Sequence, residues 1–179
     1  MCPYSKAFIT TQLYTTYTRL QDYMEVDVVP FGNGHIGERT LRSNKTYYSI
    51  TCQHGSKECK GNKIEACAVK YFKKTTEWLS VIACMSTFSD PYNRGKRCVE
   101  DRKLQWTRVS RCANGEEGER LLYEMGMRTN RQIPHVRHVP YIVVGSAYDK
   151  QAERQAVKNL FKLVCDRLGK DKPQVCKAE

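Results

Sequence analysis

The chain has 179 residues, of which 40% are hydrophobic and 27% charged, a composition typical of one globular domain rather than a disordered segment. No apolar run approaches the roughly 20 residues that a membrane-spanning helix needs, so no such helix is expected. Thirty Lys and Arg against nineteen Asp and Glu give a net charge of +11, which favours acidic partners over basic ones.

Hydrophobic periodicity predicts a helix, two strands, a block of short helices, a further strand and a final helix. In chain order the predicted elements are a helix over 5–22, strands over 24–29 and 46–52, helices over 64–72, 76–88 and 116–125, a short buried strand over 141–144, and a helix over 149–168. Gly126 and Gly169 are expected to end the helices that precede them. Strands separated by a helical insertion predict the mixed α/β class.

Cys2 stands directly before the first predicted helix, in the segment Cys2-Pro3-Tyr4-Ser5. The positive end of a helix dipole stabilises a thiolate at that place. The thiolate is the nucleophile of disulfide exchange, so the placement suits redox chemistry. The four-residue pattern is weak by itself and needs support from the rest of the chain.

A second cysteine cluster supplies that support. Its sequence is Cys52-Gln53-His54-Gly55-Ser56-Lys57-Glu58-Cys59-Lys60-Gly61-Asn62, followed by Ile64-Glu65-Ala66-Cys67. It resembles the C-Q-H-G-x-x-E-C-x-x-N signature of the gamma-interferon-inducible lysosomal thiol reductase (GILT) family at every fixed position. Three other segments are similar to motifs of that family: Val29-Pro30-Phe31-Gly32-Asn33, Cys112-Ala113-Asn114 with Glu117-Gly118, and Val139-Pro140-Tyr141-Ile142-Val143-Val144.

The resemblance implies a disulfide-rich, thioredoxin-like fold over 1–179 with a helical insertion over 56–130. It also implies that Pro140 is a cis-proline that faces the active cysteine and helps to hold an extended substrate. The family has a strand just upstream of the active-site motif. Because this chain starts at Met1-Cys2, that first strand is expected to be absent, and the chain is expected to be a mature or trimmed form.

The expected location is secreted or lysosomal. Frequent cysteines are typical of oxidising compartments. The triplet Asn44-Lys45-Thr46 is an acceptor for N-glycosylation, which agrees with passage through the secretory pathway. No cofactor is expected.

Ser5 departs from the family pattern. Active members carry C-x-x-C, in which the second cysteine resolves the mixed disulfide formed by the first. A hydroxyl cannot displace a thiolate from a disulfide, so the cycle is expected to stall after the first attack. The predicted catalytic positions are Cys2, Ser5 and Pro140.

Two classes of function stay open. The first is a secreted binding protein, weak or inactive as a reductase, which Ser5 and the positive charge favour. The second is a reductase of protein disulfides that uses Cys2 with an external thiol such as glutathione, or a trapping variant of an active reductase engineered at Ser5.

Eight cysteines remain when Cys2 is set aside, enough for four disulfides. They are Cys52, Cys59, Cys67, Cys84, Cys98, Cys112, Cys165 and Cys176. The first expected pair is Cys165–Cys176, and weaker expectations are Cys59–Cys67 and Cys98–Cys112. A zinc site built from Cys52, His54, Cys59 and Cys67 is the alternative, but the spacings lack the C-x-x-C pairs of common zinc modules, so no metal is expected.

The positive charge is densest between Arg94 and Arg111, where seven basic side chains face two acidic ones. The basic members are Arg94, Lys96, Arg97, Arg102, Lys103, Arg108 and Arg111. A field of this sign predicts a binding surface for anionic partners, and a merely solvated face is the alternative. The expected partners are disulfide-containing or cell-surface proteins together with sulfated glycans or anionic surfaces, and no specific nucleic acid.

Overall fold

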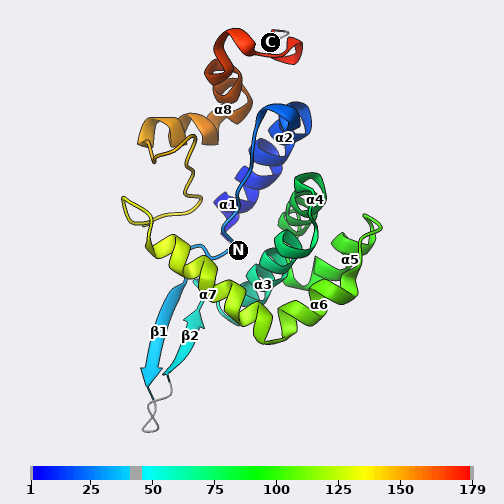
Figure 1. The fold of residues 1–179 in the computed structure, drawn as a ribbon, viewed down its shortest axis with the longest axis vertical. Helices are drawn as coiled ribbons and strands as arrows, with labels where there is room; N and C mark the ends of the chain where they lie inside the picture. Colours follow the sequence, from blue (N-terminus) through cyan, green and yellow to red (C-terminus); the bar gives the residue numbers. More distant parts are fainter. Residues whose placement is uncertain (1, 41–45, 178–179) are drawn as a thin grey trace.

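Helices dominate the computed structural model, which describes residues 2–40 and 46–177 (Figure 1). The strands within those residues form a two-stranded antiparallel sheet of β1 (His35–Thr40) and β2 (Thr46–Thr51), with Gly37 opposite Ser49. This hairpin projects away from the helices in Figure 1. None of the helices in the described ranges combines the length and the apolar composition needed to cross a membrane.

The N-terminal helical run confirms the first predicted helix. It consists of α1 (Pro3–Phe8), a π-helical turn (Ile9–Leu13), α2 (Tyr14–Leu20) and a 3-10 turn (Gln21–Tyr23). The run lies between α4 and α8 in Figure 1, and it buries Phe8, Tyr17 and Leu20. It therefore joins the C-terminal helix to the other helices of the molecule.

The predicted strand over 24–29 is wrong, because no strand is assigned there. Its alternation is real, since Met24, Val26 and Val28 pack against the helical core while Glu25 and Asp27 are exposed. An extended segment lying on helices produces the same two-residue period as a strand in a sheet. The segment thus covers part of the helical core in an extended conformation.

The predicted strand over 141–144 is wrong for a related reason. Ile142 and Val144 pack against the cluster that includes α8, as a buried strand would. Their backbone groups, however, bond to side chains of α8: the Ile142 N–H donates to Glu153 Oε1 (3.0 Å), and Arg167 Nη1 donates to the Val144 carbonyl (2.7 Å). Side chains here replace the neighbouring strand that a ladder would require.

Five α-helices lie between residues 56 and 130, where the sequence predicted three. They are α3 (Ser56–Tyr71), α4 (Thr75–Ser86), α5 (Gly95–Glu100), α6 (Trp106–Asn114) and α7 (Glu116–Asn130). Helix α7 continues through Gly126, which was expected to end it. A Cβ at Gly126 would come within 2.6 Å of Phe31 and Ile36, so this glycine permits close packing rather than a stop.

The C-terminal helix α8 (Lys150–Leu168) agrees with its prediction at both ends, but a kink at Asn159, where the backbone is not helical, divides it into two parts. The Asp149 side chain accepts a hydrogen bond from the Ala152 N–H (2.7 Å) and caps the first turn. Gly169 follows with a φ of +57°, a conformation that favours glycine, and ends the helix.

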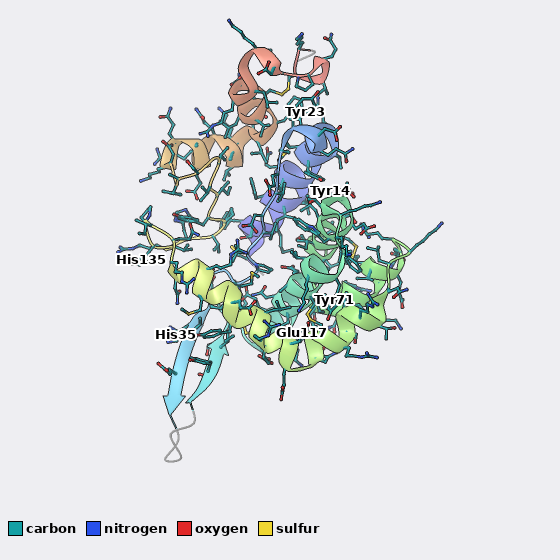
Figure 2. The ribbon with its side chains drawn as sticks, in the orientation of Figure 1. Tyr14, Tyr23, His35, Tyr71, Glu117 and His135 are labelled. Atoms are coloured by element: carbon teal, nitrogen blue, oxygen red, sulfur yellow. A yellow bond between two sulfur atoms is a disulfide. The ribbon has the colours of Figure 1, made fainter. Side chains whose placement is uncertain are left out.

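Contacts between α3 and α7 bring polar groups together at the edge of the core. Figure 2 labels Tyr71 and Glu117 at this junction. The Tyr71 hydroxyl donates to Glu117 Oε2 (2.8 Å), and Lys70 Nζ lies 2.5 Å from Glu117 Oε1. Hydrogen bonds from Lys70 and Tyr71 hold the pKa of the Glu117 carboxyl below its usual range.

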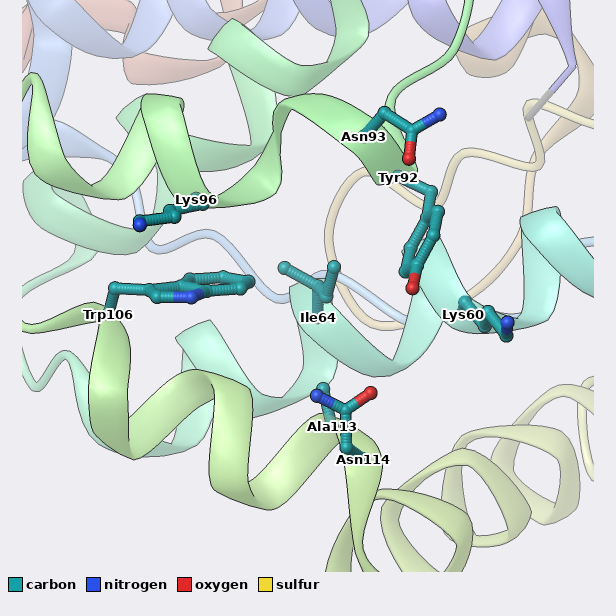
Figure 3. A pocket seen from close by; sticks show the side chains of 8 residues that line it. All are labelled: Lys60, Ile64, Tyr92, Asn93, Lys96, Trp106, Ala113 and Asn114. Atoms are coloured by element: carbon teal, nitrogen blue, oxygen red, sulfur yellow. The ribbon is translucent and has the colours of Figure 1, made fainter.

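Helices α5 and α6 pack on α3 and leave a cavity of about 170 Å³ between them (Figure 3). Ile64 forms its centre, and Trp106 flanks it. A Cβ at Gly95 would lie 3.0 Å from Ile64 Cδ1, so a larger residue would crowd this packing.

Four disulfides hold the helices together. They are Cys52–Cys59, Cys67–Cys112, Cys84–Cys98 and Cys165–Cys176. The last pair agrees with the expectation, whereas the expected pairs Cys59–Cys67 and Cys98–Cys112 are wrong. The disulfides Cys67–Cys112 and Cys84–Cys98 join helices that pack against each other, α3 with α6 and α4 with α5. Short separation along the chain therefore did not identify these partners.

Replacing both Cys165 and Cys176 by Ala is expected to lower the free energy of unfolding by about 3 kcal/mol. The disulfide closes a short loop between α8 and the C-terminal 3-10 turn, and the reduced chain gains entropy mainly when unfolded. Urea unfolding measures the loss, with the exposed Lys170→Ala as the matched control. A loss no larger than that of the control would contradict the prediction.

Candidate functional site

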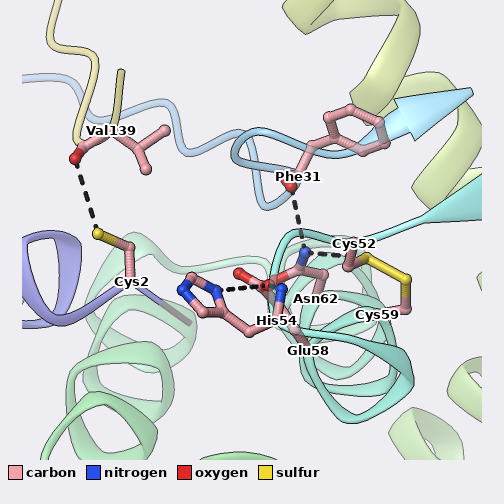
Figure 4. A network of polar contacts seen from close by, with 8 residues as sticks. All are labelled: Cys2, Phe31, Cys52, His54, Glu58, Cys59, Asn62 and Val139. Atoms are coloured by element: carbon pink, nitrogen blue, oxygen red, sulfur yellow. Dashed lines mark hydrogen bonds and ion pairs between the residues drawn. A yellow bond between two sulfur atoms is a disulfide. The ribbon is translucent and has the colours of Figure 1, made fainter. Parts of the chain in front are cut away.

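Cys2 lies at the N-terminal end of α1 and is half-buried. Its carbonyl accepts from the Lys6 N–H (3.0 Å), so the residue begins the helical run. Its thiol donates toward the Val139 carbonyl oxygen, with 3.7 Å between sulfur and oxygen (Figure 4). This contact places the segment that carries Pro140 against Cys2, and the Val139–Pro140 peptide within it is cis.

Ser5 lies in the first turn of α1 and is half-buried. Residues three apart on a helix share a face, so its hydroxyl occupies the position from which a second thiol could reach Cys2. Both residues thus lie at the start of the same helix, but a hydroxyl cannot displace a thiolate from a disulfide.

The cysteine-cluster motif is folded around a tight turn into α3. Gly55 has a φ of +82°, which favours glycine. The His54 N–H donates to Glu58 Oε2 (2.6 Å), and His54 Nδ1 lies 2.8 Å from the same oxygen. Cys52 and Cys59 close the turn with a disulfide. In Figure 4 the His54 ring lies on the side of the motif that is turned toward Cys2.

Three polar side chains form a buried stripe along α3. Glu58, Asn62 and Glu65 recur at helical spacing, and the Asn62 amide donates to the Phe31 carbonyl (3.4 Å). Glu65 is only 3% exposed, and its Oε1 has no hydrogen-bond partner among the described groups. Burial, aided by the nearby Glu58 charge, raises the pKa of Glu65 to about 8.

Glu153 of α8 anchors the segment that carries Pro140. Its carboxylate lies 2.8 Å from His138 Nε2 and accepts from the Tyr148 hydroxyl (2.9 Å), in addition to the Ile142 N–H. These contacts hold both ends of the segment on α8. Helix α8 therefore positions the backbone that faces Cys2.

The basic segment predicted as a binding surface divides into two parts. Arg102 is structural, since its guanidinium donates to the Cys98 carbonyl and to Ser80 Oγ, each at 2.9 Å. The remaining six are exposed: Arg94, Lys96, Arg97, Lys103, Arg108 and Arg111. They lie on α5, α6 and the segments that flank these helices.

The residues of the alternative zinc site are otherwise engaged. Cys52 and Cys59 bond to each other, and Cys67 bonds to Cys112. Within the described ranges no three His, Cys, Asp or Glu side chains gather as a metal-binding group. Asn44, the predicted glycosylation acceptor, lies outside the described residues.

Sequence reasoning missed Glu65, Glu153 and the cavity beside Trp106. The sequence could have indicated Glu65 and Glu153, because each is a carboxylate on the apolar face of a predicted helix. Nothing in the sequence indicated the cavity, since its walls come from three separate helices.

Comparisons with known proteins point to one family. Residues 1–102 match the family described as gamma interferon inducible lysosomal thiol reductase. The chain is 32% identical to the "Gamma-interferon-inducible lysosomal thiol reductase" of Carassius auratus, over 98% of this chain and 68% of that protein. It is also 32% identical to "GILT-like protein 1" of Drosophila melanogaster (98% and 74% covered) and 26% identical to the Mus musculus thiol reductase (98% and 68% covered).

Proposed function

The chain belongs to the gamma interferon inducible lysosomal thiol reductase family, and from this we propose that it exchanges disulfides through the single thiol of Cys2. It captures a substrate disulfide as a mixed disulfide and depends on an external thiol for release. By itself it is a weak reductase, because Ser5 stands where active members carry the resolving cysteine.

One observation carries this proposal. Among the described residues Cys2 is the single free cysteine, and the other eight form four disulfides. A thiolate is the attacking species in exchange, so Cys2 is the one group in this chain able to begin the reaction. Its contact with the Val139 carbonyl sets it beside the irregular backbone segment that carries Pro140, the segment on which an extended substrate would bind.

The chemistry proceeds in three exchanges. The Cys2 thiolate attacks one sulfur of the substrate disulfide; a new S–S bond forms, and the second substrate sulfur leaves as a thiolate that takes up a proton. An external thiol such as glutathione then attacks the Cys2 sulfur and releases the first substrate sulfur as a thiol. A second external thiol frees Cys2, so that two thiols are oxidised for each substrate disulfide reduced.

The family supports a thioredoxin-like arrangement with the helices of 56–130 as its insertion, and a secreted or lysosomal location. Four disulfides suit such a compartment, since they persist where conditions are oxidising. The substrates proposed on this basis are protein disulfides.

Incubation with denatured insulin or IgG, followed by alkylation and mass mapping, tests the function. We expect an adduct at Cys2 that glutathione dissolves, and one reactive thiol per chain under denaturing, non-reducing conditions. Cys2→Ser should form no adduct. An adduct at any other cysteine, or turnover without external thiol, would refute the single-thiol mechanism.

Binding of anionic partners is a second candidate, favoured by the exposure of six cations around α5 and α6. This attraction would act independently of Cys2 and would be screened over about 8 Å at physiological ionic strength. It would concentrate the protein on sulfated glycans or other anionic surfaces, where disulfide-containing proteins are also found.

A further inference from the structure

The cavity of about 170 Å³ between α3, α5 and α6 is lined by none of the residues of the thiol site. Two aromatic rings, Trp106 and Tyr92, stand on opposite sides of Ile64 (Figure 3). Lys60 and Lys96 contribute a positive charge near each ring. Both lysines are exposed; Lys60 Nζ lies 5.3 Å from the centre of the Tyr92 ring, and Lys96 Nζ lies 3.8 Å from Glu100 Oε1, a surface ion pair that a sulfate would replace.

Two amide side chains complete the lining, and their orientation is set by their neighbours. Asn93 Nδ2 donates to Asp90 Oδ2 (2.7 Å), and Asn114 Nδ2 donates to the Ser110 carbonyl (2.9 Å). Because each amide nitrogen already faces an acceptor, the amide oxygen is left to accept a hydrogen bond. A ligand in this cavity therefore meets flat apolar rings, cations and hydrogen-bond acceptors.

We infer that this cavity binds one sugar unit of a sulfated glycan. The faces of a sugar ring are apolar and stack on aromatic side chains, its hydroxyls donate to the amide oxygens of Asn93 and Asn114, and its sulfate groups pair with Lys60 and Lys96. The inference deepens the second candidate function by naming its ligand, and it is independent of Cys2.

Size and surroundings support a chain of sugars over a free small molecule. A cavity of about 170 Å³ is below the roughly 300 Å³ at which pockets enclose a whole drug-sized ligand, so it accommodates one ring of a longer molecule. Arg111 lies one turn before Asn114 on α6, and exposed cations continue along α5. Neighbouring sulfated units would lie across these charges.

Binding of a heparin-derived hexasaccharide to the full chain tests the inference, by calorimetry and by the fluorescence of Trp106. We expect Lys60→Gln combined with Lys96→Gln to weaken binding at least tenfold, and Trp106→Ala to do the same while Trp106→Phe retains most of the affinity. The matched control combines Lys150→Gln with Lys158→Gln, which removes the same charge from α8 and should change affinity less than twofold. Far-UV circular dichroism verifies that each variant is folded.

Each other result overturns the inference. If the Lys60/Lys96 double variant and the Lys150/Lys158 double variant weaken hexasaccharide binding equally, the protein attracts anions in general, as the second candidate function states, and the cavity is not the binding site. Absence of hexasaccharide binding at low salt would refute both the cavity site and the second candidate function. Polyglutamate or oligothymidylate competing as well as the hexasaccharide would show that the cavity recognises charge without recognising sugar. Cys2→Ser should leave hexasaccharide affinity unchanged, so these failures do not bear on the thiol chemistry.

Discussion

Ser5→Cys is expected to turn the protein into a reductase that releases its substrate without an external thiol in each exchange. The introduced thiol would lie three residues from Cys2 on one helix face, held within reach of the mixed disulfide. An attacking group positioned on the same molecule outcompetes one that must diffuse in. We expect insulin turnover at low thiol concentration to rise by about tenfold or more.

Two controls separate this effect from a change of fold or of nucleophile. Ser5→Ala should leave turnover at the level of the unaltered chain, because the hydroxyl has no role in exchange. Cys2→Ser combined with Ser5→Cys should abolish it, because the attacking thiol is gone. Unaltered turnover in Ser5→Cys at pH 4.5 and 7 would contradict the view that the missing resolving thiol limits the reaction.

Glu65→Gln is expected to reduce the pH dependence of folding stability. The carboxyl has a pKa of about 8 when buried, against 4.5 ordinarily, so the folded chain holds a proton that the unfolded chain releases between these values. Stability from this group is complete below pH 4.5 and is lost as the pH rises toward 8. At about 1.4 kcal/mol for each pKa unit, the loss reaches about 5 kcal/mol.

Urea unfolding at pH 5.0 and 8.0 measures this effect. The amide cannot ionise, so Glu65→Gln should resemble the unaltered chain at pH 5.0 and exceed it by a few kcal/mol at pH 8.0. Glu25→Gln, at an exposed carboxyl, should leave the profile unchanged. If the free energy of unfolding changes with pH as much in Glu65→Gln as in the unaltered chain, Glu65 is ionised in the folded state and the prediction is wrong.

Two other carboxyls, those of Asp90 and Glu117, make folding stability rise with pH instead of fall, but they do so at lower pH. Hydrogen bonds from Lys57 to Asp90, and from Lys70 and Tyr71 to Glu117, lower the pKa of each carboxyl. Their stabilising contribution is present above the ordinary carboxyl pKa and lost as the pH falls below it. Among these three carboxyls Glu65 therefore accounts for the pH dependence expected between pH 5 and 8, where its stabilising contribution falls as the pH rises.

Local sequence pattern was enough for the features that depend on neighbouring residues. The helix that begins beside Cys2 and the capped helix that ends at Gly169 both lie where the pattern predicted them. Helical periodicity and capping are set within a few residues, which explains this agreement. Counting cysteines likewise predicted one free thiol, although it could not name the partners of the others.

Tertiary structure alone decided which groups distant in the chain meet. The apolar run over 141–144 predicted a short buried strand, but Glu153 and Arg167 of α8 bond to its backbone groups, and no local pattern encodes that contact. The same holds for the bond of Cys67 to Cys112 and for the cavity beside Trp106, each made by helices separated along the chain. Glu65 looks like any helical carboxylate in the sequence; its altered pKa exists only because packing removes it from water.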